Sequence, residues 1–219
     1  MDPQERDSRP RRVVRAVGAL GGARGEARVL VEIALRTGGA AAVLLDLEGR
    51  PAEALDAARA CARAQLDMGA HIVDTFRAVD AATGRGDRAA SVVVVAIDGA
   101  RGEVSVIARG GALVVVPPRQ EPATLVTAFR AGVPPLRVHA FEPGAALLAA
   151  TVGMSEDTTG LLALAARLEL PRADAAHFEP GSARFAAAVA DHARAPRTSS
   201  REAAVLLADC IGECGDRSN

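Results

Sequence analysis

Residues 40–46 read AAAVLLD, and LEGRP at 47–51 leads from them directly into AEALDAARACARAQL at 52–66. A continuous apolar run that stops on a lone acid is typical of a buried β-strand. Pro51 suits the first turn of a helix, and the apolar residues behind it repeat at helical spacing. These residues are Leu55, Ala58, Ala62 and Leu66. The stretch therefore predicts a buried strand that ends on Asp46 and an amphipathic helix that follows at once.

Eight further short runs of β-branched and apolar residues predict strands. They are Val13–Ala19, Arg28–Leu35, Ser91–Ile97, Glu103–Ala108, Ala112–Val116, Leu136–Phe141, Ala145–Thr151 and Ala203–Cys210, with a helix left open for the last. The run 28–35 is expected to pair antiparallel with 40–46, and 91–116 to form a three-stranded meander. Residues 136–151 are expected to form another hairpin, around the turn Glu142-Pro143-Gly144.

Four helices are predicted from apolar residues at helical spacing, at 51–67, 70–81, 156–168 and 182–194. The irregular stretch 119–135 is expected to contain a short helix around Leu125–Arg130. Strands come first along the chain, then two helices, strands again, and finally helices and a last strand. Such segregation suits an α+β sandwich in which helices cover two packed antiparallel sheets. We expect a single domain over 13–212, between a flexible leader at 1–12 and a tail at 213–219.

Composition narrows the class of protein. The 219 residues carry a formal net charge of −1, with 26 basic residues that are all Arg, and the chain has no Trp and no Tyr. This balance argues against a broad nucleic-acid surface, and stacking platforms for bases are missing. No apolar run approaches the roughly 18 residues of a membrane span, so we expect no membrane partner. Three cysteines, of which Cys210 and Cys214 have no assigned role, fit a reducing cytoplasm.

Asp46 is the main candidate for chemistry. An acid at the mouth of a strand, with Gly49 three positions on, is where metal-dependent hydrolases commonly place a ligand. A divalent metal site needs several oxygen ligands from different segments, and the other plausible segments offer none at matching places. A solvated acid at the end of a strand or at the start of a helix, where its charge is favourable, is the interpretation that we favour from the residues alone.

Three segments carry a family likeness. Val43–Arg50 reads VLLDLEGR, Ala90–Pro118 forms a strand–turn–strand with Asp98 at the turn, and Phe141–Glu156 reads FEPGAALLAATVGMSE. Together they resemble the metal-dependent serine/threonine protein phosphatase (PPM) superfamily, in particular its bacterial branch of sporulation and stress-response regulators. The likeness spans residues 13–212 and implies a phosphatase-like sandwich of two antiparallel β-sheets flanked by α-helices. It also implies a site for two Mg²⁺ or Mn²⁺ ions that activate water for attack on phosphate.

The resemblance keeps part of that metal site. Asp46 stands for the acid of the family motif Gly-Asp-x-Ser-Gly-x-Gly, and the carbonyl of Leu47 would be the neighbouring ligand. Glu26 is the one acid near the place of the early Gly-Asp-Phe-x-Asp motif. These three residues are the metal ligands that we expect if a site survives.

Other stations of the family site are changed. The Asp of the family's Asp-Gly pair falls on Val152, and its terminal Asp-Asp pair falls on Arg201-Glu202. An apolar side chain cannot replace a carboxylate in a site for hard cations. We therefore expect a degenerate, phosphatase-like regulatory or binding protein of bacterial signalling, with no catalytic residue assigned and no cofactor. The alternative is an active serine/threonine phosphoprotein phosphatase with a rearranged Mn²⁺ or Mg²⁺ site.

If catalysis is lost, recognition of a protein partner explains why the fold is kept, and the family suggests a regulatory phosphoprotein. The proline-bearing stretch 117–135 is long enough to be functional rather than a plain connection. Leu125 and Phe129 would lie on one apolar face if the stretch were helical, so we expect them to bind the partner. An ordinary surface loop is the competing interpretation.

Overall fold

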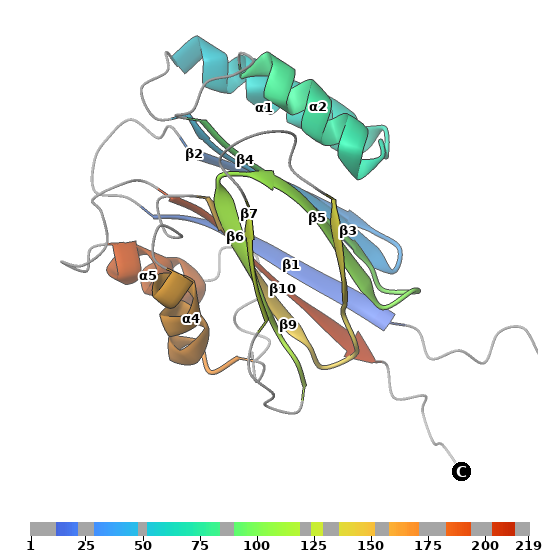
Figure 1. Cartoon of the computed structure of the whole chain (residues 1–219), viewed down its shortest axis with the longest axis vertical. Helices are drawn as coiled ribbons and strands as arrows, with labels where there is room; N and C mark the ends of the chain where they lie inside the picture. Colours follow the sequence, from blue (N-terminus) through green and yellow to red (C-terminus); the bar gives the residue numbers. More distant parts are fainter. Residues whose placement is uncertain are drawn as a thin grey trace, which may run out of the picture.

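The computed structural model describes residues 12–21, 29–47, 52–83, 90–118, 124–128, 136–151, 158–170, 183–193 and 203–212. Two five-stranded antiparallel sheets pack against each other, and a pair of helices lies on the outer face of each sheet (Figure 1). The α+β sandwich expected from the sequence is confirmed. No helix in the described part of the chain has the length and apolar character needed to cross a membrane.

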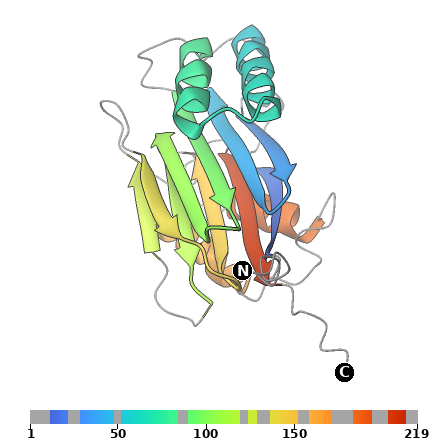
Figure 2. The same cartoon turned by 90° about the vertical axis from the view of Figure 1, so that its right-hand side faces the viewer.

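The first sheet has the order β2-β3-β4-β5-β8. Its strands are β2 (Val29–Arg36), β3 (Gly39–Leu47), β4 (Ala90–Asp98), β5 (Glu103–Arg109) and β8 (Arg137–Ala140). Helices α1 (Ala52–Asp67) and α2 (Ile72–Ala82) lie side by side on its outer face (Figure 2). The predicted pairing of residues 28–35 with 40–46 is confirmed as β2 against β3.

The second sheet has the order β1-β10-β9-β6-β7. Its strands are β1 (Arg12–Gly21), β10 (Ala203–Gly212), β9 (Ala146–Thr151), β6 (Gly111–Val116) and β7 (Thr124–Ala128). Helices α4 (Thr158–Arg167) and α5 (Ala183–Ala193) cover its outer face. The four predicted helices are thus confirmed, and the last strand, left open between strand and helix, is a strand.

Side chains alternate along each strand between two apolar layers. On β3, Ala40, Ala42 and Leu44 face the other sheet. Val43 and Leu45 on the same strand pack against α1 and α2 instead. Every residue of β3 is buried, because both of its faces are covered. This is why the sequence of β3 is an almost unbroken apolar run rather than an alternation of polar and apolar residues.

Two predicted connections are wrong because, in each of them, the chain crosses from one sheet to the other. Strands β4 and β5 form a hairpin, but β6 leaves their sheet and pairs with β7 and β9 in the other. Gly110, with φ +65°, adopts a left-handed conformation between β5 and β6 that favours glycine, and the chain crosses between the sheets there. Residues 136–151 likewise form no hairpin, because β8 belongs to one sheet and β9 to the other.

The predicted short helix around Leu125–Arg130 is also wrong. Residues 124–128 form β7, which pairs antiparallel with β6, so that Leu125 lies opposite Val114. The periodicity of a short apolar run does not distinguish a helix from a strand. Here residues 124–128 form a strand because they pair with the edge of β6 that β9 does not occupy.

We predict that Gly111→Ala destabilises the protein by about 1–3 kcal/mol through overpacking. An added Cβ would lie 2.4 Å from Val93 Cγ2 and 2.7 Å from the carbonyl oxygen of Ala150, so backbone would have to move. Urea unfolding followed by far-ultraviolet circular dichroism measures the change, since the chain has no Trp or Tyr for fluorescence.

Gly38→Ala is the matched control, because Gly38 has φ +74° but no atom within 4 Å of the added Cβ. It carries the cost of backbone strain without crowding, about 1 kcal/mol. Equal losses for the two variants would contradict the view that the sheets approach closely at Gly111.

Candidate functional site

Asp46 lies near the end of β3 with its side chain in the layer between the two sheets. It is 5% exposed, and it follows Ala42 and Leu44 on the face of β3 that meets the second sheet. Its neighbours across the first sheet are Val29 on β2 and Ser91 on β4. Asp46 is therefore not a solvated surface acid, and the interpretation that the sequence favoured for it is wrong. A carboxylate buried this far needs a partner, and its environment has to be considered as a possible site.

Polar groups from both sheets gather at this end of the sandwich. The Ser91 hydroxyl donates a hydrogen bond to the carbonyl oxygen of Gly110, where the chain crosses between the sheets. On the second sheet, Thr151 is fully buried, and its Oγ1 accepts a hydrogen bond of 3.0 Å from the backbone N–H of Ala204. We call this region, comprising Asp46, Ser91, Gly110 and Thr151, the Asp46 end.

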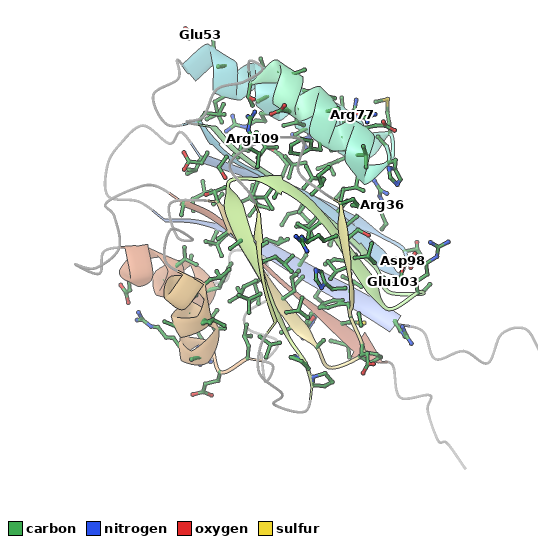
Figure 3. All side chains as sticks on the ribbon, viewed as in Figure 1. Arg36, Glu53, Arg77, Asp98, Glu103 and Arg109 are labelled. Carbon is green, nitrogen blue, oxygen red and sulfur yellow. The ribbon has the colours of Figure 1, made fainter. Side chains whose placement is uncertain are left out.

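One more acid lies close to the Asp46 end but on the opposite face of the first sheet. Arg109, at the end of β5, lies beneath α1 and α2, whereas Asp98 and Glu103 mark the far end of the same hairpin (Figure 3). The Nη1 atom of Arg109 is 2.7 Å from Oδ1 of Asp80 on α2. Asp80 therefore links α2 to β5 by an ion pair. Its side chain lies on the helix-covered face of the first sheet and not in the layer between the sheets, where Asp46 lies.

The described residues do not fit a centre for two divalent ions. Mg²⁺ and Mn²⁺ prefer several oxygen ligands, and paired ions need carboxylates to offset their mutual repulsion. Within the described ranges, no three acidic, His or Cys side chains lie close enough together to hold a metal ion. The hydroxyls of Ser91 and Thr151 already take part in hydrogen bonds with backbone groups. Asp46 is the one carboxylate that the described residues bring to this end of the inter-sheet layer.

The other predicted site residues are placed as follows. Leu47 is next to Asp46, and its side chain, 1% exposed, packs toward α1 and α2. Leu125 lies in β7 rather than on a helical face. Glu26 and Phe129 lie outside the described residues, as do Val152 and the Arg201-Glu202 pair. The metal role of Leu47 and Glu26 and the partner role of Leu125 and Phe129 stay predictions.

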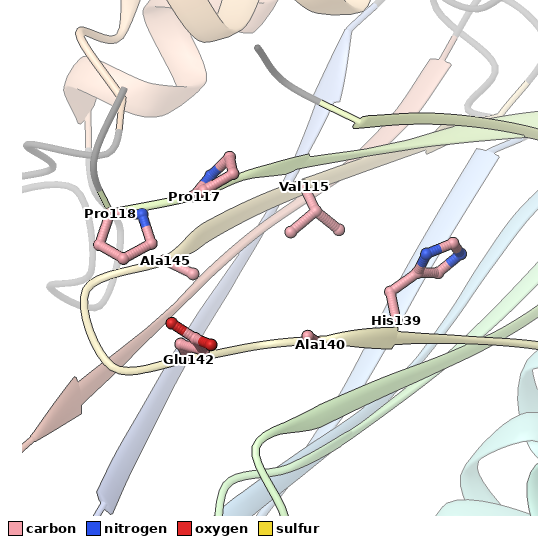
Figure 4. Close-up of a pocket in the computed structure, with 7 residues that line it drawn as sticks. All are labelled: Val115, Pro117, Pro118, His139, Ala140, Glu142 and Ala145. Atoms are coloured by element: carbon pink, nitrogen blue, oxygen red, sulfur yellow. The ribbon is translucent and has the colours of Figure 1, made fainter. Parts of the chain in front are cut away.

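A pocket that the sequence did not reveal lies at the opposite end of the inter-sheet layer (Figure 4). Its volume is about 260 Å³, and it opens beside the edge strand β8. Its lining comes from β6, β8 and the segments that follow them: Val115, Pro117, Pro118, His139, Ala140, Glu142 and Ala145. The inward position of His139 depends on the pairing of β8 with β5, a long-range contact that no local pattern signals.

The electrostatics of this pocket depend mainly on His139. Burial lowers the pKa of its imidazole, and the nearby charge of Arg137 lowers it further. His139 is therefore neutral at pH 7. Its Nε2 atom is buried and has no hydrogen-bond partner among the described residues.

The overall fold is shared with known phosphatase domains. No protein-family model matches this chain, and no characterised protein matches it by sequence. The structure of the RsbU and RsbW domains of Rv1364c from Mycobacterium tuberculosis has a TM-score of 0.68 at 20% identity, over 93% of this chain and 63% of that one. The PP2C phosphatase domain of SpoIIE from Bacillus subtilis, with a fragment of its regulatory domain, has a TM-score of 0.67 at 13% identity, over 93% and 64%.

This chain thus spans less than two thirds of the length of those two structures. A third match is the catalytic domain of the serine/threonine phosphatase PstP in complex with two manganese ions, with a TM-score of 0.55 at 17% identity, over 91% of this chain and 99% of that one. The order of strands, the two helix pairs and these matches lead to one conclusion: the chain has the fold of the PP2C-type (PPM) phosphatases found in bacterial sporulation and stress regulators.

Proposed function

We propose that this chain is a phosphatase-fold regulatory protein of bacterial signalling whose metal site is degenerate, and that it acts by binding another protein. The observation that carries the proposal is the environment of Asp46, whose neighbours across the sheet are Val29 and Ser91 rather than acids. The sequence adds that Val152, directly after β9, stands where the family has an acid.

The physical argument concerns charge. Two divalent cations a few ångströms apart repel each other strongly. Protein sites offset this repulsion with several carboxylate ligands, which further residues orient by hydrogen bonds. A site to which the described residues bring one carboxylate leaves most of that repulsion uncompensated. Activation of a water molecule by such a pair of ions is then not supported.

The structures that share this fold support the proposal of a protein partner. The M. tuberculosis neighbour contains an RsbU domain together with an RsbW domain, and another neighbour comes from work on the bacterial stressosome, a modular system that controls secondary messenger signaling. A regulatory phosphoprotein is the partner class that we propose for this chain, bound through the stretch 117–135 that includes Leu125 and Phe129.

Hydrolysis of a phosphoserine peptide in the presence of Mn²⁺ or Mg²⁺ tests the loss of catalysis. We expect the wild-type rate to equal that of Asp46→Asn, because one carboxylate does not assemble the ion pair. PstP, assayed in parallel, shows that the peptide and ions are competent. Turnover that Asp46→Asn abolishes would favour the alternative, an active phosphatase with a rearranged site built from Asp46, the carbonyl of Leu47 and Glu26.

Thermal unfolding tests metal binding without any assay of activity. An ion at about 100 times its Kd stabilises a folded protein by about 2.7 kcal/mol, which corresponds to roughly 5–10 °C in Tm for a chain of this size. We expect Mn²⁺ to leave the Tm of the wild type unchanged within experimental error. A rise in Tm that is present in the wild type and absent in Asp46→Asn would show that a specific site exists.

The partner hypothesis is tested by capture from a native lysate. We expect a double variant, Leu125→Ser with Phe129→Ser, to lose a partner that the wild type retains, with little change in Tm, because the replaced side chains would contact the partner and not the core. Leu162→Ser on α4, where Leu162 is 37% exposed, is a control apolar-to-polar change away from the stretch. A large fall in the Tm of the double variant would instead place these side chains in the core.

A further inference from the structure

The pocket between β6 and β8 is separated from the Asp46 end by the length of the sandwich. Gly111, at the Asp46 end, and Val115, in the pocket, are four residues apart on β6, which corresponds to about 13 Å. The two regions share no residue. An inference about the pocket therefore does not depend on whether the Asp46 end is active.

The framework of the pocket is fixed by backbone hydrogen bonds. The backbone N–H of Ala145 donates to the carbonyl oxygen of Glu142 at 2.9 Å, and that of Gly144 donates to the carbonyl oxygen of Cys210 on β10 at 2.7 Å. Gly144 also lies close to Pro118, since a Cβ added to it would be 3.0 Å from the Pro118 ring. The segment that carries Glu142 is thus held in place before any ligand arrives, which lowers the entropic cost of binding.

Two polar groups bracket this space. His139 lies at one end of the pocket and Glu142 at the other, and Val115 on β6 lies between them (Figure 4). Nε2 of His139 is a buried polar atom with no partner among the described residues.

The charges of the lining residues determine which class of ligand the pocket favours. A neutral imidazole accepts a hydrogen bond through one of its ring nitrogens, and the carboxylate of Glu142, which is exposed at the rim, attracts a cation. The charge of Arg137 is near His139, but Arg137 is not among the residues that line the pocket, so Glu142 is the one carboxylate or cation in the described lining and an anion would meet its negative charge. A donor-rich cation is therefore the complementary group.

The volume and the lining of the pocket indicate the shape of the ligand. A volume of about 260 Å³ is smaller than the roughly 300–1,000 Å³ typical of sites for drug-sized ligands. Val115, Pro117 and Ala145 give the pocket apolar walls that suit methylene groups. A single aliphatic chain with a cationic head fits both the volume and the lining.

We propose that this pocket binds an aliphatic guanidinium or ammonium group, with its head near Glu142 and its methylene chain against Val115 and Pro117. The source is either the side chain of an Arg or Lys on a protein partner or a free alkylamine. Both offer the same chemistry to the pocket, and the experiment separates them.

The test is a titration followed by the imidazole resonances in ¹H–¹³C NMR spectra of the full chain, with the His139 signal assigned by its loss in His139→Phe. The probes are agmatine, a short blocked peptide with one Arg, and the same peptide with citrulline, which is neutral and nearly isosteric. We expect agmatine, the Arg peptide or both to shift the His139 signal saturably, and the citrulline peptide to bind more weakly by up to about fivefold.

Glu142→Gln and Glu103→Gln form a matched pair of charge-neutralising variants. Glu103 is an exposed acid that lies opposite Ala140 across the β5–β8 pair but does not line the pocket. We expect Glu142→Gln to weaken binding by up to about fivefold and Glu103→Gln to leave it unchanged. Binding of agmatine alone identifies a free amine as the ligand, and binding of the Arg peptide alone identifies a partner's side chain. No saturable shift of His139 with either probe, or equal effects of the two Glu variants, overturns the proposal.

Discussion

The central strands of this sandwich have to bury both of their faces, and the other features of the fold follow from that constraint. One face meets the second sheet and the other meets a pair of helices, so β3 is buried along its whole length. With no Trp, no Tyr and five Phe, the chain fills these layers mostly with Ala, Val and Leu. Small side chains allow the close approach that leaves no room for a Cβ at Gly111.

The burial of Asp46 in this apolar interior is unfavourable for folding. A carboxylate that is 5% exposed in an apolar layer costs free energy unless neighbouring groups compensate it. A family site with several acids and two cations would provide that compensation. In this chain the groups nearest to Asp46 in register are Val29 and Ser91.

Much of the fold could be predicted from local patterns, because the apolar pattern of a few consecutive residues indicates each helix and most strands. The run 40–66 predicted both β3 and α1. The crossings between sheets could not be predicted, since Arg109-Gly110-Gly111 reads as a simple turn and the sheet that β6 joins depends on β9, whose paired residues come 30 to 40 positions later in the chain.

The site was predicted less well than the fold. Asp46 was identified from its place at a strand end, but its burial between the sheets was not, because burial depends on which face of β3 meets the second sheet. The pocket was missed entirely. It forms where β8 meets β5 and where the segment 141–145 passes beside Pro118, and neither contact has a local signal in the sequence.

The position of β10 has a consequence for how the protein is made. This strand lies between β1 and β9, and Arg15 on β1 pairs with Asp209 on β10 across 194 positions of sequence. During synthesis β1 is made before its partner strand β10, whereas β2 to β5 can pair as they emerge. The nascent chain therefore carries β1 without its partner strand until β10 has been made. Chaperones that hold exposed strands have their longest opportunity to act at β1.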